Sequence, residues 1–181
     1  MLINYYDAGF SNLKNTVIVT DPCYPEDSWC SKVLKDVQEG RFKCLLRISG
    51  EEDWGRRVSN LIAIHEDYLD CIDFKDGFQY DSKLICQIPY YNVIGVDSGQ
   101  AGIFNYDYYK THQPDNDWNL DINGNKSWYR RICDITGSES LGGVVDNAGV
   151  VSCSGYGDGS YTCSAFYDVK TEKIVGILID F

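Results

Sequence analysis

The sequence places a cysteine thiol on a turn, in residues 21–24 (DPCY). Proline has no place in a strand ladder and Asp-Pro favours a turn, so Cys23 could be an exposed nucleophile. His65 could activate such a thiol, but it ends an apolar strand pattern and nothing near it in the sequence marks a base. We therefore predict a structural turn, with a thiol enzyme as the alternative. The residues of this turn are Asp21, Pro22, Cys23 and Tyr24.

Two glycine-rich segments could approach a ligand closely, namely residues 96–102 (VDSGQAG) and residues 155–160 (GYGDGS). A phosphate-binding loop opens a helix or brings a lysine, and neither follows these glycines. Both segments therefore predict turns, with the Asp97 carboxylate bonding amides of its own loop. If the turns met, Asp97 and Asp158 could form a carboxylate pair of the glycosidase type, a second enzymatic alternative. The motif residues are Asp97, Gly99, Gln100, Gly157, Asp158 and Gly159.

The metal-binding patterns are incomplete. Asp117, Asn119 and Asp121 place oxygen side chains at every second position, as the start of a calcium loop does. Counted from Asp117 the glycine comes one residue late, and counted from Asn119 an arginine, Arg130, stands where a bidentate acid belongs. The eight cysteines contain no C-x-x-C pair, which predicts mostly buried, reduced thiols. We expect no metal and no cofactor, with a calcium-stabilised structural module as an alternative.

The charge of the chain is strongly negative and unevenly distributed. Its 27 acidic and 16 basic residues give a formal net charge of −11, the wrong sign for binding nucleic acid or an anionic membrane. Residues 66–121 alone hold eleven acids and three lysines, a net −8. The acidity is therefore regional, and direct binding to DNA, RNA or membranes is not expected.

Strands must position most of these residues. Apolar, β-branched runs separated by turn residues predict strands at residues 15–20, 41–48, 58–65, 83–88, 93–96 and 144–152, the last broken by a turn at 146–149. Alternation over residues 161–167, a polar turn and the apolar run 173–181 predict a C-terminal hairpin. One helix is predicted from a Ser28 cap to a Gly40 stop. Its apolar residues recur at intervals that would place them on one face of a helix; they are Trp29, Val33, Leu34 and Val37.

These elements predict a mainly β (α+β) fold, as a single antiparallel curled sheet or a sandwich- or barrel-like domain with one or two short helices. No linker-like stretch divides the sequence, so we expect residues 1–181 to form a single domain. The composition is 44% hydrophobic, enough for a sizeable core, while the longest apolar stretches are too short to span a membrane. The N-terminus lacks the pattern of a secretion signal, which predicts a cytoplasmic protein.

Taken in order, the segments TDPCY, GRFKCLL, VDSGQAGIF, SGYGDGSYTC and GILIDF resemble an uncharacterised phage and bacterial family, one of the domains of unknown function. Within it, the opening NYYDAGFSN and VIVTDPCY is similar to gut-bacterial and phage anti-CRISPR inhibitors of the type II RNA-guided CRISPR nuclease. The broad family implies a β-rich domain and no chemistry. The narrower resemblance implies a non-enzymatic protein in the host bacterial cytoplasm that binds the guide-RNA-loaded nuclease and blocks target DNA binding or cleavage.

Such nucleases hold DNA in positively charged channels, which an acidic protein surface could occupy. The resemblance and the charge together predict an acidic partner-binding face within residues 66–121. Its expected members are Glu66, Asp67, Asp70, Asp73, Asp76, Asp81, Asp115, Asp117 and Asp121.

Overall fold

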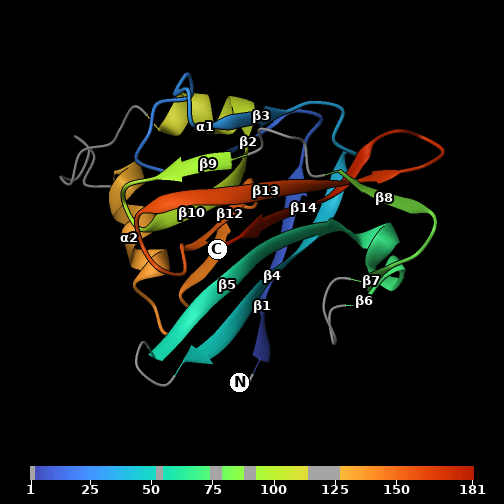
Figure 1. Ribbon diagram of the computed structural model, residues 1–181. Coiled ribbons are helices and arrows are strands. Elements are labelled where there is room, and N and C mark those ends of the chain that lie inside the picture. The colour runs from blue at the N-terminus through green and yellow to red at the C-terminus, as the bar shows by residue number, and fades with distance from the viewer. Residues whose placement is uncertain (1–2, 52–54, 74–78, 88–92, 114–126) are drawn as a thin grey trace.

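The computed structural model of the protein describes residues 3–51, 55–73, 79–87, 93–113 and 127–181, and the structural statements below concern these residues. Most of them form antiparallel strands in two packed sheets, with short helices on the outside (Figure 1). The mainly β fold class expected from the sequence is therefore confirmed. No helix in these ranges is both long and apolar enough to cross a membrane.

The larger sheet has seven strands within the described residues. Their order is β1 (Ile3–Leu13), β4 (Gly40–Glu51), β5 (Gly55–His65), β14 (Ile174–Asp180), β13 (Gly159–Asp168) and β8 (Leu84–Gln87). The seventh strand, β9 (Val93–Val96), pairs with the first half of β13, while β8 pairs with its second half. The predicted C-terminal hairpin is thus confirmed as β13 and β14, and β14 lies inside the sheet between β5 and β13.

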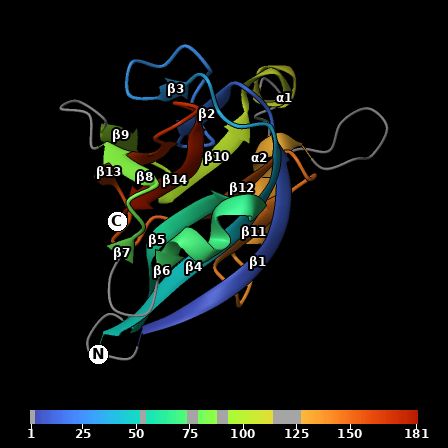
Figure 2. The same ribbon diagram turned by 90° about the vertical axis from the view of Figure 1, so that its right-hand side faces the viewer.

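The smaller sheet has five strands among the described residues. Their order is β11 (Gly142–Val145), β12 (Gly149–Cys153), β10 (Gln100–Asn105), β2 (Val17–Thr20) and β3 (Lys32–Leu34). Its outer face is covered by two helices, α1 (Tyr106–His112) and α2 (Trp128–Thr136). The 3-10 helix η1 (Glu66–Cys71) and the short pair β6 (Ile72–Asp73) and β7 (Gln79–Tyr80) cover the outer face of the larger sheet (Figure 2).

Alternation of side chains along the strands produces three apolar layers. On β2, Val17 and Val19 face the central core between the sheets, and Ile18 faces the helices on the other side. On β14, Ile177 faces the same central core, and Leu178 packs under η1 and the β6–β7 pair. Because both faces of these strands are buried, they read as continuous apolar runs in the sequence.

The helix predicted from Ser28 to Gly40 is wrong. Residues 32–34 form β3, which satisfies its backbone by pairing with β2 at the edge of the smaller sheet. Asp36 and Gly40 have φ of +60° and +144°, values that no α-helix contains. The apolar spacing is real, but only part of it is used, since Leu34 and Val37 are buried while Trp29 and Val33 are exposed.

Candidate functional site

The chain crosses between the two sheets at the glycine-rich motifs. Residues 97–99 link β9 of the larger sheet to β10 of the smaller one, and residues 154–158 lead from β12 back to β13. The two links lie side by side, because the Ser154 N–H donates to the Gly99 carbonyl over 2.9 Å. We call this region, together with residues 21–24, the motif junction.

Two glycines set the backbone of these links. Gly99 and Gly157 have φ of +71° and +94°, a region that favours glycine. A side-chain carbon on Gly99 would lie 3.9 Å from the Gly157 Cα, so the two loops touch. The predicted turns are confirmed, although Gln100 and Gly159 already belong to strands β10 and β13. The loops that carry Asp97 and Asp158 therefore meet.

Within the motif junction, Asp21 binds the end of β2 to the link at residues 97–99. Its fully buried carboxylate accepts the N–H of Asp97 at 2.8 Å, the N–H of Ser98 at 2.7 Å and the Ser98 hydroxyl at 2.6 Å. It also accepts the Cys23 N–H at 2.9 Å. The expectation that Asp97 bonds the amides of its own loop is thus wrong. A buried carboxylate needs several donors, and the turn offers two consecutive N–H groups to it.

The helices hold the main chain of residues 21–24 from the other side. The Tyr109 hydroxyl lies within hydrogen-bond distance of the Asp21 carbonyl, at 3.2 Å, and of the Tyr24 carbonyl, at 2.6 Å. The Trp128 indole N–H donates to the Pro22 carbonyl over 2.9 Å. The Gln113 side-chain amide donates to the Cys23 carbonyl over 3.5 Å. Residues 21–24 are therefore held on one side by the Asp21 carboxylate, which binds the loop at 97–98, and on the other by their main-chain carbonyls, which accept from the helices.

The surroundings of Cys23 oppose a nucleophilic role. Burial, and then the nearby carboxylates of Asp21 and Asp97, raise the pKa of the Cys23 thiol to about 12, so it stays protonated at neutral pH. His65 lies on β5, where its ring packs edge-on against Phe42 and its Nδ1 accepts the Asp67 N–H over 3.3 Å. The geometry thus lends no support to a Cys23–His65 thiol enzyme.

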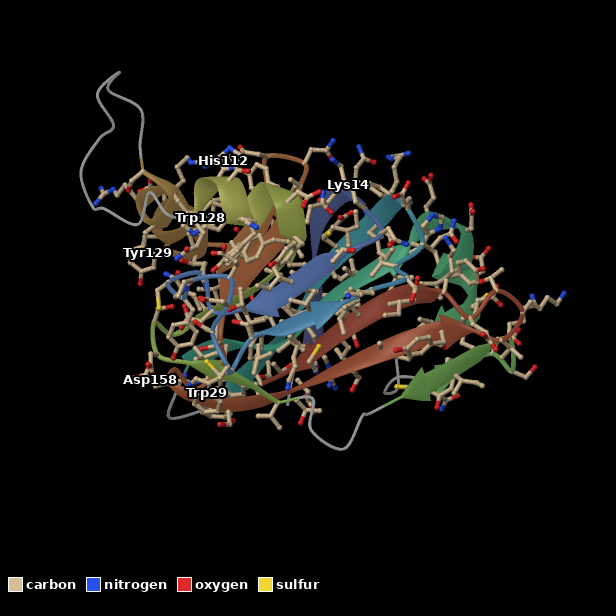
Figure 3. All side chains as sticks on the ribbon, turned by 90° about the horizontal axis from the view of Figure 1, so that it is seen from above. Lys14, Trp29, His112, Trp128, Tyr129 and Asp158 are labelled. Atoms are coloured by element: carbon tan, nitrogen blue, oxygen red, sulfur yellow. The ribbon has the colours of Figure 1, made fainter. Side chains whose placement is uncertain are left out.

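A surface hollow of about 470 Å³ opens beside the motif junction. Its lining includes Tyr24, Ser28, Trp29, Asp97 and Ser160. The Trp29 side chain is 93% exposed, and Asp97 is exposed as well. Burial, and then a hydrogen bond to the Asp97 carboxylate, raise the pKa of Tyr24 well above its ordinary value. In Figure 3, Trp29 and Asp158 lie at the same end of the molecule.

The described members of the predicted acidic face come together elsewhere. Glu66, Asp67 and Asp70 lie on η1, Asp73 follows on β6, and the Asp81 N–H returns to the carbonyl of residue 71 over 2.8 Å. All of them but Glu66 are exposed. We call these five residues the acidic cap. The remaining predicted members, Asp76, Asp115, Asp117 and Asp121, lie outside the described residues.

Thiols and metal ligands add no second reactive centre to the described part of the chain. Its cysteines are present as thiols, of which Cys30, Cys44 and Cys163 are buried and the others half-buried. No group of three or more His, Cys, Asp or Glu side chains in the described ranges is placed to hold a metal ion. The calcium-loop candidates Asp117, Asn119 and Asp121 lie outside those ranges.

Sequence reasoning missed three residues that build this region. The helix predicted from Ser28 places Trp29 on its apolar face, whereas the structure shows the side chain exposed. Tyr109 and Trp128 lie on helices that were not predicted. A signal for α2 was available, because Ser127 caps it and Trp128, Ile132 and Thr136 recur every fourth residue on its buried face.

No family model, curated protein or solved structure matches the chain. Its function must therefore be argued from its own residues.

Proposed function

We propose that this chain is a non-enzymatic binding protein whose acidic cap docks on a basic surface of a protein partner. The carrying observation is that the cap gathers five carboxylates on one short segment, four of them on exposed residues. Glu66 pairs with Arg41 over 3.1 Å, and Lys83 adjoins Asp81, so the cap keeps an excess of negative charge. Exposed carboxylates speed encounter with a basic partner and set its orientation more than they add affinity.

The partner we propose is the guide-RNA-loaded type II CRISPR nuclease. Support comes from the resemblance of the opening segments, residues 4–12 and 17–24, to anti-CRISPR proteins. Charge complementarity adds to it, since such nucleases hold DNA in basic channels. In this proposal the acidic cap takes the place of DNA phosphates and so blocks target DNA binding or cleavage. A binding role also fits the motif junction, where Asp21 is consumed by structural hydrogen bonds and the Cys23 thiol is protonated.

The test is to neutralise the acidic cap without changing its shape. Asp67, Asp70, Asp73 and Asp81 are replaced together by Asn, which keeps the size of each side chain and an oxygen acceptor. Inhibition of target DNA cleavage by the guide-loaded nuclease is then measured over a salt series. We expect the variant to inhibit less, most clearly at low salt, because exposed charges are screened as salt rises.

A matched variant removes four exposed acids outside the cap, with Asp36 and Asp107 replaced by Asn and Glu139 and Glu172 by Gln. It has the same net charge as the cap variant, so the comparison separates position from total charge. The proposal expects this control to inhibit nearly as well as the parent protein. Equal inhibition by the parent and a folded cap variant across the salt series would sink the proposed docking surface.

A further inference from the structure

Trp29 is more exposed than any other large apolar side chain in the described residues, at 93% against 58% for Tyr156, the next. A tryptophan so placed gains nothing from burial in the folded chain, and tryptophan is enriched among the residues that carry protein–protein contacts. What distinguishes Trp29 is its setting, a held backbone and a hollow that it shares with a carboxylate.

The backbone around Trp29 is held in place. The Ser28 N–H donates to the Pro25 carbonyl over 3.1 Å and the Ser31 N–H to the Ser28 carbonyl over 3.0 Å. The next residue, Cys30, is buried, and its carbonyl accepts the Gly95 N–H of β9 over 3.1 Å. A side-chain carbon at position 95 would lie only 3.0 Å from the Cys30 Cβ, so glycine permits this close packing. Trp29 is thus presented from a fixed turn.

The other polar groups of the hollow favour a cation. Asp97 is exposed and lines the hollow together with Tyr24 and Trp29. A carboxylate accepts several hydrogen bonds, so Asp97 can receive donors from a bound ligand. Within the described residues the lining of the hollow contains no lysine or arginine to neutralise Asp97. An indole face and a carboxylate in one hollow together attract positive charge.

We infer that this hollow is a second binding site, which takes the side chain of an arginine from a protein partner. A guanidinium can stack flat on the Trp29 indole while its edge donates to the Asp97 carboxylate, and both contacts suit its planar, forked shape. A lysine ammonium fits less well, because it is more strongly hydrated and cannot stack. The hollow, about 470 Å³ in volume, has room for one long side chain.

This inference goes beyond the proposed function, because it does not depend on the acidic cap or on the identity of the nuclease. The hollow is lined by residues of β9 and of the start of β13, whereas the acidic cap lies on η1, on β6 and just after β7. Figure 1 shows these two groups of elements at opposite ends of the sandwich. The two surfaces can therefore be tested one at a time.

The experiment titrates the ¹⁵N-labelled protein with a short capped peptide containing arginine between glycines and serines, and follows the Trp29 indole N–H by NMR. A second peptide carries citrulline in place of arginine, which keeps the shape and removes the charge. We expect a saturable shift of the Trp29 signal with the arginine peptide and little with the citrulline peptide. Substitutions Asp97→Asn and Trp29→Ala should each weaken binding by about fivefold, as expected for exposed charge and cation–π contacts. Trp29→Ala has no indole signal, so its binding is followed through the backbone N–H signals of Ser28, Cys30 and Ser31.

Two control variants guard against unspecific attraction to an acidic protein. Asp107→Asn removes an exposed carboxylate on α1, and Tyr80→Ala removes an exposed ring beside the acidic cap. Both should bind the arginine peptide as the parent does, with unchanged backbone spectra showing that every variant is folded. Equal binding of both peptides, or unchanged binding by Asp97→Asn, would overturn the inference. A shift of Trp29 with neutral maltotetraose but not with the arginine peptide would also overturn it, in favour of a carbohydrate site.

Discussion

Asp21 shows how a single buried carboxylate can hold two distant segments together. It lies at the end of β2, and it accepts two main-chain N–H groups and a hydroxyl from residues 97 and 98. The next residue, Gly99, accepts the Ser154 N–H, so the loop that Asp21 holds is also bonded to the turn at 154–158. The shape of the Trp29 hollow depends on Asp21 as well, because Tyr24 follows it in the same clamped segment.

Replacing Asp21 by Ala should therefore destabilise the protein by about 2–4 kcal/mol, because a buried carboxylate is removed and the part-buried N–H groups at 97 and 98 lose their acceptor. Urea unfolding monitored by circular dichroism measures this change in the free energy of unfolding. Asp27→Ala, at an exposed position in the same loop, serves as the control and should change stability by less than about 0.5 kcal/mol. Similar stabilities for the two variants would contradict the role given to Asp21.

The Cys23 thiol gives a pH-dependent prediction. Because burial and the carboxylates of Asp21 and Asp97 raise its pKa to about 12, the reactive thiolate is scarce at neutral pH. Alkylation of Cys23 by iodoacetamide should be much slower than that of a free thiol, and should quicken about tenfold for each pH unit while the protein stays folded. Mass spectrometry of the Cys23 peptide reports the rate. Fast alkylation at neutral pH would revive the thiol-enzyme alternative.

At the scale of elements, β14 is a central strand of the larger sheet and contributes strongly to its stability. It pairs with β5 on one side and β13 on the other, and Ile177 and Ile179 point into the central core with no exposed surface. Ile179→Ala should cost about 3 kcal/mol of stability, since it removes buried methyl groups and leaves a cavity. Thermal unfolding provides the measurement. Val169→Ala, at a side chain that is 48% exposed, should cost far less, and equal losses would refute the buried position of β14.

The elements that could be predicted are those whose pattern is local. The β13–β14 hairpin has its alternation, its polar turn and its buried return strand within consecutive residues, so the sequence sufficed. The segment after Ser28 is wrongly predicted as a helix, because a four-residue apolar spacing also fits a loop followed by an edge strand. Pairing of residues 32–34 with β2 stabilises the strand instead of the helix. In β1 a bulge at Gly9, with φ of +98°, shifts the register and disrupts the alternation that marks a strand.

The motif junction was predictable only in part, for the same physical reason. Glycine and Asp-Pro signals locate its turns, because they reflect local backbone preferences. Its hydrogen bonds join residues far apart in the chain, such as Asp21 with Ser98 and Tyr109 with Tyr24. No local pattern encodes such pairs, so the sequence points to Asp97 as the acceptor of the loop amides, where the structure has Asp21.

At the scale of the whole molecule, the sandwich separates two surfaces of different chemistry. The acidic cap rests on the outer face of the larger sheet, and the Trp29 hollow lies where the chain crosses between the sheets. Both surfaces belong to the same packed sandwich. A partner that contacts both surfaces would therefore need a basic patch and a separate arginine at a matching distance, which favours a large protein over a short peptide.

Association with the guide-loaded type II CRISPR nuclease is the most direct test of the proposed docking. Gel filtration of the mixture at low and at high salt, with the cap variant Asp67, Asp70, Asp73 and Asp81→Asn alongside, shows whether a complex forms and whether charge drives it. The account predicts that the parent protein co-elutes with the nuclease at low salt, that high salt reduces the complex, and that the cap variant forms less of it. Absence of a complex at both salt concentrations, or a complex that the cap variant and high salt leave unchanged, would contradict it.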